Sequence, residues 1–295
     1  MDGFLLVDKP GGWTSHDVVA KTRAMTGMRK VGHAGTLDPM ATGLLVLGLG
    51  RATRLLRFVQ EAPKEYLATA LLGVATDTLD AEGSVLTREP MPVTEADVRR
   101  TMGLWTGDVM QRPPMVAARR VGGRRLYDLA RQGVEVEREA RPVTIYELEL
   151  VDFAPSDYPE ATFRVRCSRG TYVRALADDI AAGLGGRAHL TALRRTRNGS
   201  LSVEEALTID RLGALTASDA WRSAVLPPSD GLPDLPALEV SPELVTGIRH
   251  GLSVPVGALG DAPEEGAVRL VAPEGGLLAV YAVRGGRATP EVVLA

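Results

Sequence analysis

The chain has 295 residues, with 34 lysines and arginines against 37 aspartates and glutamates, a formal net charge of −3 and 45% apolar residues. This composition argues against a disordered or fibrous chain and predicts one large domain, or one large and one small. Glycines interrupt the apolar runs well before the roughly 20 residues that cross a bilayer, and the N-terminus lacks the basic start of a signal peptide. One cysteine, Cys167, excludes an intramolecular disulfide, so we expect a cytoplasmic protein without membrane contact.

Charge is distributed in blocks. Residues 1–57 and 111–145 each carry a net +4 and residues 164–200 a net +6, whereas 58–110 and 146–163 each carry −5 and 201–295 carry −7. Only four basic residues are lysines, and arginine can bind phosphate in a bidentate manner. Either the basic blocks fold into one face that binds nucleic acid, or they scatter over the surface and the arginine content reflects coding bias.

Alternating apolar segments and turns define the first hundred residues. Residues 4–7 predict a buried strand, which ends at the turn of residues 9–12. A helix should follow, with Ser15 as N-cap, Asp17 in its first turn and Gly27 just after its end. Residues 32–39 predict a loop, followed by an apolar stretch over 41–49, a strand over 66–73 and a short helix over 94–103 capped by Thr94.

The remaining chain predicts a strand pair, a helix and a separate small module. Residues 143–153 and 161–168 alternate as two strands, and 171–184 form an amphipathic helix. Four prolines between residues 226 and 237 predict a linker, and apolar runs over 268–272, 277–283 and 291–294 predict an all-β module. The fold class is therefore α+β, with domains at 1–225 and 238–295 and a linker at 226–237.

The loop that contains Asp38 is the best candidate for chemistry. It reads GHAGTLDPMATG over residues 32–43, and its glycines permit close approach of backbone to a ligand. Asp38 could serve there as nucleophile or general base, or could simply bond its own backbone in an Asp-Pro turn. The sequence contains no phosphate-binding loop or dinucleotide fingerprint, and its four histidines are far apart, so we predict no metal site.

Several segments together resemble the bacterial tRNA pseudouridine-55 synthases, the TruB family. In chain order they are GFLLVDKP at 3–10, GWTS at 12–15, the loop at 32–43, KEY at 64–66, QRPPM at 111–115, GRRLYDLARQG at 123–133, CSRGTYVR at 167–174 and LRR at 193–195. The resemblance runs from residue 3 to about residue 200. It implies a mixed, largely antiparallel central sheet, with a C-terminal module similar to PUA-type RNA-binding domains over 238–295.

The resemblance also implies an activity and its catalytic residues. The expected reaction converts a uridine in the T-loop of tRNA, position 55, to pseudouridine without a cofactor. Asp38 matches the essential carboxylate, Arg174 the arginine that pairs with it and holds it ionised, and Tyr66 a tyrosine that stacks on the base. His33 matches a histidine that enters the space left by the flipped base, and Leu193 lines the uracil pocket.

The resemblance implies further contacts to the RNA. Lys9 supports the catalytic loop, and Tyr172 and Arg195 lie in matching motifs where we expect substrate contacts. Residues 112–141 correspond to an inserted, basic thumb with Arg124 and Arg125; Ala117 and Arg120 depart from the family pattern of a serine and a lysine. The expected partner is the T-arm stem-loop of tRNA, bound by a monomer. The acidic C-terminal module is expected to have either a reduced RNA-binding role or a purely structural one. The alternatives to catalysis at Asp38 are a tRNA-remodelling protein without activity, or a hydrolase with a second acid nearby.

Overall fold

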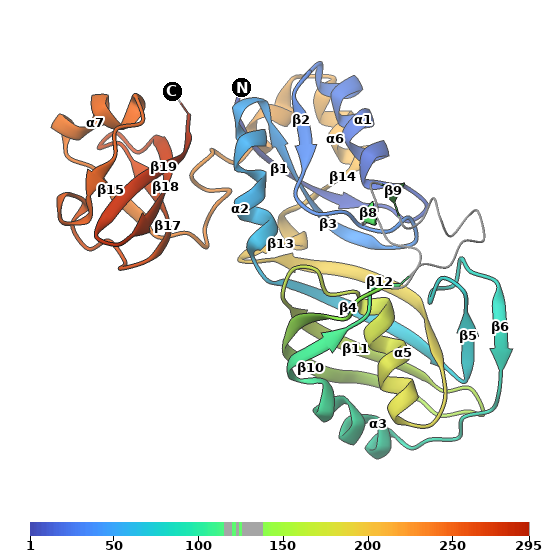
Figure 1. Cartoon of the computed structure of the whole chain (residues 1–295). Helices are drawn as coiled ribbons and strands as arrows, with labels where there is room; N and C mark the ends of the chain where they lie inside the picture. The colour runs from blue at the N-terminus through green and yellow to red at the C-terminus, as the bar shows by residue number, and fades with distance from the viewer. Residues whose placement is uncertain (115–119, 122–123, 126–137, 295) are drawn as a thin grey trace.

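A large mixed sheet forms the centre of the molecule (Figure 1). The computed structural model describes residues 1–114, 120–121, 124–125 and 138–294. Within this part of the chain the sheet has ten strands in the order β14-β1-β3-β12-β4-β11-β10-β7, with β2 paired to β3 and β13 to β12. These strands are β1 (Gly3–Lys9), β2 (Val31–His33), β3 (Thr42–Leu49), β4 (Lys64–Leu72), β7 (Gly107–Gln111), β10 (Arg141–Ala154), β11 (Glu160–Cys167), β12 (Ala188–Asn198), β13 (Leu201–Ser202) and β14 (Leu207–Thr208).

The pairing within this sheet is mainly antiparallel, as expected. Only β1 with β14 and β3 with β12 run parallel among the described pairs. The β3–β12 pair brings the loop before β3 beside Arg195 of β12, and this approach requires glycine at position 43. Gly43 has a φ of +98°, and a Cβ there would lie 2.2 Å from the carbonyl oxygen of Arg195. The end of the Asp38 loop and β12 are therefore in close backbone contact.

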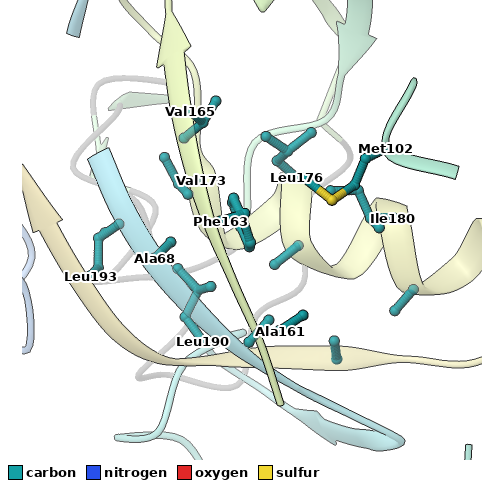
Figure 2. Packing of buried hydrophobic residues seen from close by; sticks show 14 of the residues in the cluster. Ala68, Met102, Ala161, Phe163, Val165, Val173, Leu176, Ile180, Leu190 and Leu193 are labelled. Atoms are coloured by element: carbon teal, nitrogen blue, oxygen red, sulfur yellow. The ribbon is translucent and has the colours of Figure 1, made fainter. Parts of the chain in front are cut away.

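Helices pack against the apolar clusters of the molecule. The helices are α1 (Ser15–Thr26), α2 (Leu56–Glu61), α3 (Glu95–Met102), α5 (Val173–Gly183), α6 (Ile209–Thr216) and α7 (Pro242–Arg249). Figure 2 shows α5 packed on β4, β11 and β12, where Leu176 and Ile180 meet Phe163 and Leu190. Leu176 is 0% exposed and Phe163 2%, so the helix that carries Arg174 is embedded in the main apolar cluster.

Local sequence signals place most of these elements, with one correction at α1. The N-cap is Thr14, whose side chain accepts from the backbone of Asp17 while Asp17 bonds back to Thr14; Ser15, the predicted cap, is the first helical residue. Gly27 ends the helix in the left-handed conformation, as predicted, and Thr94 caps α3. The shift by one residue frees the buried Ser15 hydroxyl for a different contact, described below.

The C-terminal module has its own sheet and core, but it is not all-β. Its strands are β15 (Ala237–Glu239), β16 (Val254–Pro255), β17 (Gly266–Val271), β18 (Leu277–Arg284) and β19 (Arg287–Val293), and α7 packs on them. A helix was missed there because residues 242–249 precede the three apolar runs from which the module was predicted. Two small hairpins complete the described strands: β5 (Val74–Thr76) with β6 (Val85–Arg88), and β8 (Arg120–Val121) with β9 (Arg124–Arg125).

The segment predicted as a linker packs against both neighbouring parts. Leu226 exchanges two backbone hydrogen bonds with Phe4 of β1, at 2.9 and 2.8 Å, and Leu232 is 3% exposed. Arg269 of β17 donates to the carbonyl oxygens of Ser229 and Leu235 at 2.7 and 2.8 Å. The prolines in this segment therefore shape a fixed connection rather than a free spacer.

Three arginines tie the last strand to the first half of the chain. Arg51 donates to the carbonyl oxygen of Leu294, Arg54 to that of Val293 at 2.7 Å, and Arg57 pairs with Glu291. They are spaced three residues apart along the 3₁₀ turn Gly50–Leu55 and helix α2, so they share one side. Among the described residues, no helix has the length and apolar character needed to span a membrane.

Candidate active site

Asp38 lies on a loop whose backbone is fixed on both sides. The Ser15 hydroxyl accepts from the backbone N–H of Leu37 at 2.9 Å, and its oxygen is 3.3 Å from the Leu37 carbonyl oxygen. After Asp38, the carbonyl oxygen of Pro39 accepts from Lys9 Nζ at 3.1 Å and from the N–H of Gly12 at 2.9 Å. The backbone does turn at Asp38, whose carbonyl oxygen accepts from the N–H of Ala41 at 3.1 Å, but the fold also holds both flanking residues from two other segments.

Arg174 connects Asp38 to a second carboxylate. It stands in the first turn of α5, and its Nη2 lies 3.0 Å from Asp38 Oδ2. Its Nη1 lies 2.9 Å from Asp80 Oδ2 and donates to the carbonyl oxygen of Thr78 at 2.7 Å. The side chains of Arg174 and Asp80 are 3% and 5% exposed, whereas Asp38 is 36% exposed. Asp38 is thus the member of this group that a substrate can reach.

The electrostatics at Asp38 have opposing contributions. Burial raises the pKa of Asp38 above the ordinary value, and the Asp80 carboxylate adds to the rise, while Arg174 and Lys9 oppose it. Arg174 therefore favours the ionised form as expected, but it does not outweigh burial. Burial also lowers the pKa of Lys9 to about 8, and Asp38 opposes this change. The loop thus holds a carboxylate that takes up a proton more readily than an ordinary aspartate.

Tyr66 and Leu193 are placed on neighbouring strands of the sheet. Tyr66 of β4 is the register partner of Arg195 in β12, and Leu193 of β12 is the partner of Ala68 in β4. Burial raises the pKa of Tyr66, and the Arg195 guanidinium opposes the rise. Leu193 is 7% exposed and belongs to the cluster beneath α5, next to Ala68 (Figure 2). Tyr66 packs against the same cluster, so the two residues form one apolar wall.

His33 is partly buried at the end of β2 and faces another histidine. The rings of His16 and His33 are 5.3 Å apart between centroids and nearly perpendicular. Burial lowers the pKa of His33, and His16 and Arg195 lower it further, although a backbone hydrogen bond to Gly35 opposes them. The imidazole is therefore predominantly neutral near pH 7.

Lys9 supports the Asp38 loop as expected, whereas the substrate contact expected of Arg195 does not match where that side chain lies. Lys9 is 0% exposed and also donates to the carbonyl oxygens of Pro10 and Trp13, at 2.8 and 2.6 Å. Arg195 is 1% exposed and donates to the carbonyl oxygens of Leu44 and Gly35, at 2.7 and 3.2 Å. Both side chains donate hydrogen bonds to backbone carbonyl oxygens in and around the Asp38 loop, so we assign them to the support of this loop.

Three other predicted positions are Tyr172, Arg124 and Arg125. Tyr172 is partly buried and immediately precedes α5. Arg124 and Arg125 form β9, but their side chains, like that of Arg120, lie outside the described residues, as does all of Ala117. The expected RNA contacts of the segment 112–141 therefore stay predictions.

Comparison with known proteins shows the family of this chain. The family model described as "TruB family pseudouridylate synthase (N terminal domain)" matches residues 23–173. A protein named tRNA pseudouridine synthase B from Thermobifida fusca (strain YX) is 45% identical, covering 100% of this chain and 99% of its own length. One of the same name from Syntrophotalea carbinolica is 43% identical, covering 95% and 91%. The chain belongs to the TruB family.

Solved structures share the fold over nearly all of this chain. A chain in a structure of an H/ACA RNP bound to a substrate RNA containing 2′-deoxyuridine superposes with a TM-score of 0.78 at 25% identity, covering 99% of this chain and 85% of its own length. A chain in a Cbf5-Nop10-Gar1 complex gives 0.78 at 26% identity, covering 99% and 85%. The α+β pseudouridine synthase fold with a C-terminal module is thereby confirmed.

Sequence reasoning missed two residues that hold this TruB site together. Asp80 comes from the turn between β5 and β6, where its Oδ1 also accepts from the Thr78 hydroxyl at 2.5 Å and from the N–H of Glu82 at 3.1 Å. No periodicity or spacing marks it, because its importance comes only from contact with a helix nearly a hundred residues later. Ser15 was noticed, but as a cap.

The basic block at residues 164–200 is largely neutralised within the fold. Of its eight arginines, six pair with described carboxylates: Arg164 with Glu149, Arg166 with Glu147, Arg169 with Glu61, Arg174 with Asp38 and Asp80, Arg187 with Asp178, and Arg194 with Asp8. The acidic block at 146–163 supplies two of these partners because β10 pairs with β11. Much of this block is therefore not free positive charge facing RNA.

Proposed function

We propose that this chain converts the uridine at position 55, in the T-loop of tRNA, to pseudouridine, with Asp38 as the essential carboxylate. Its family, and relatives named tRNA pseudouridine synthase B along its whole length, make the chain an isomerase that acts on tRNA. The observation that carries the catalytic assignment is the 3.0 Å pair of Asp38 with Arg174, on a loop fixed at both flanking residues.

The proposed chemistry needs one reachable carboxylate and no co-substrate. The bond between N1 of the base and C1′ of the ribose breaks, a bond between C5 and C1′ forms, the proton on C5 leaves that carbon, and N1 takes up a proton. Product and substrate have the same atoms, so we expect no cofactor. An ionised Asp38 is suited to attack the sugar, add to the base or take a ribose proton, and its side chain stays 36% exposed while it pairs with buried Arg174.

The surroundings of Asp38 suit a base taken out of its stack. Flipping a base costs a few kcal/mol in lost stacking, which the enzyme has to offset. Tyr66 and Leu193 provide an apolar wall for the extracted uracil, and the Tyr66 hydroxyl, with its raised pKa, stays protonated at neutral pH. The flat, neutral ring of His33 is suited to stack in the space that the base leaves.

The test uses a T-arm stem-loop RNA carrying tritium at C5 of its uridines. Asp38→Asn should release no tritium above background while binding the stem-loop with nearly the wild-type Kd, because the substitution keeps the shape of the side chain and removes its charge. Undiminished release by Asp38→Asn would overturn the assignment of Asp38.

A matched substrate tests the position. Replacing only the uridine at position 55 by cytidine should abolish release from the wild-type enzyme, and continued release would contradict the T-loop assignment. Binding without release from the unmodified stem-loop would instead favour the alternative of a tRNA-remodelling protein without catalysis.

A further inference from the structure

Gln111 makes a two-point contact with the start of α5. It is the last residue of β7, and it is 3% exposed. Its Oε1 accepts from the backbone N–H of Tyr172 at 2.7 Å, and its Nε2 donates to the backbone carbonyl oxygen of the same residue at 3.1 Å. One buried amide therefore satisfies both backbone groups of Tyr172, from a strand 61 residues earlier in the chain.

This contact determines where α5 begins. Tyr172 is the N-cap of the helix, and its carbonyl oxygen also accepts the helical bond from the N–H of Leu176 at 3.0 Å. Tyrosine is not one of the residue types that cap helices with their own side chains, so the directional contact comes from Gln111 instead. Arg174 follows two residues later, before the helix has completed one turn.

Apolar packing alone leaves a helix some freedom to rotate or slide. The cluster beneath α5 sets how close the helix lies to the sheet, but apolar contacts have no preferred direction (Figure 2). Hydrogen bonds do have a preferred direction, and the helix has a second directional anchor at its middle, where Asp178 pairs with Arg187 at 2.7 Å. Near Arg174, the two hydrogen bonds between Gln111 and Tyr172 limit rotation and sliding of the helix.

We propose that Gln111 is a positioning residue that sets the guanidinium of Arg174 against Asp38. This inference rests on the proposed function of Asp38. It predicts that the chemical step, rather than the binding of RNA, depends on the ability of residue 111 both to donate and to accept. Glutamate at this position accepts from the N–H but, when ionised, repels the carbonyl oxygen; methionine has a similar length and does neither.

The first measurement is the single-turnover rate of tritium release at saturating enzyme. We expect Gln111→Met to lower it by about 10- to 100-fold and Gln111→Glu by less, with the Kd for the stem-loop within about 3-fold of wild type, because small misplacements of catalytic groups are costly. The proposal would be overturned if the tritium-release rates of the Gln111 variants ranked with their Tm values and not with the ability of residue 111 to donate and accept hydrogen bonds. Leu212→Val, in the separate core around α6, supplies a control that loses stability away from the site.

The second measurement is the dependence of that rate on pH. Asp38 is influenced by Arg174, Asp80 and Lys9, and Arg174 favours its ionised form. If Arg174 moves away in Gln111→Met, the acidic limb of the profile should shift to higher pH. An unchanged limb would contradict the proposal. Activity in Asp38→Asn would instead refute the proposed function, so the two failures are distinguishable.

Discussion

Arg174 and Asp80 form an ion pair that is buried on both sides, with Nη1 and Oδ2 at 2.9 Å and side-chain exposures of 3% and 5%. The same guanidinium reaches Asp38 through Nη2 at 3.0 Å. One arginine thus pairs with two carboxylates, of which Asp80 is buried and Asp38 is 36% exposed. Asp80 fixes the cation, and Asp38 remains available for chemistry.

Replacing Asp80 should affect both stability and the pH profile. Asp80→Asn leaves Arg174 with one charged partner, and we expect a loss of roughly 3 kcal/mol in the free energy of unfolding. Because the Asp80 carboxylate raises the pKa of Asp38, the acidic limb of the rate profile should move to lower pH, opposite to the shift expected for Gln111→Met. Urea unfolding and single-turnover rates across pH 4 to 8 measure these effects, and a limb that moves upward would contradict this account.

The Ser15 hydroxyl should matter for rate, whereas its neighbour should matter only for stability. Ser15→Ala removes both contacts with Leu37, so the residue before Asp38 loses its anchor, and kcat should fall about 10-fold with little change in KM. Thr14→Ala removes the N-cap of the same helix and should cost about 1 kcal/mol of stability. Steady-state kinetics and thermal unfolding of both variants separate these effects. Equal kcat losses would show that the helix, not the loop anchor, is responsible.

Asp179 should make the protein less stable as pH rises. Burial, followed by the neighbouring Asp178, raises the pKa of Asp179 to about 6 from 3.8. The native state then holds this proton more tightly than the unfolded chain, so its contribution is present below about pH 4 and lost as pH rises through about 6. Asp179→Asn should therefore gain about 1 to 2 kcal/mol over wild type at pH 7.5 and much less at pH 4.5. Urea titrations at the two pH values test this, and a gain independent of pH would refute it.

RNA binding should weaken with salt, but not through the paired arginines on β11. Each phosphate contact contributes about 0.9 to the slope of log K against log[salt] on a duplex. Arg164 and Arg166 pair with Glu149 and Glu147, so Arg164→Gln and Arg166→Gln should leave the slope for the T-arm stem-loop unchanged. The slopes of the two variants and of the wild type are compared by filter binding between about 50 and 300 mM salt. A slope reduced by about one in either variant would place that arginine on a phosphate.

Strands, helices and the catalytic loop could be predicted because their signals are local. Alternation of apolar residues located β10 and β11, and the motif resemblance located Asp38 and Arg174. Asp80 could not be found, because a buried ion pair between distant segments leaves no periodic signal. The side chain of Arg195 was misassigned for a related reason: a basic residue in a motif gives no indication whether it faces phosphate or backbone carbonyls. Burial alone decides this.

Arg51 brings the two ends of the chain together. Its backbone N–H and Nε donate to the Asp2 carboxylate, and its Nη1 donates to the carbonyl oxygen of Leu294. Figure 1 shows both ends on the same side of the molecule. Proteins with adjacent ends tolerate circular permutation when the new opening lies in an exposed loop. A short linker from residue 294 to residue 2, with the chain opened at the exposed turn of residues 155–157, should therefore preserve the fold.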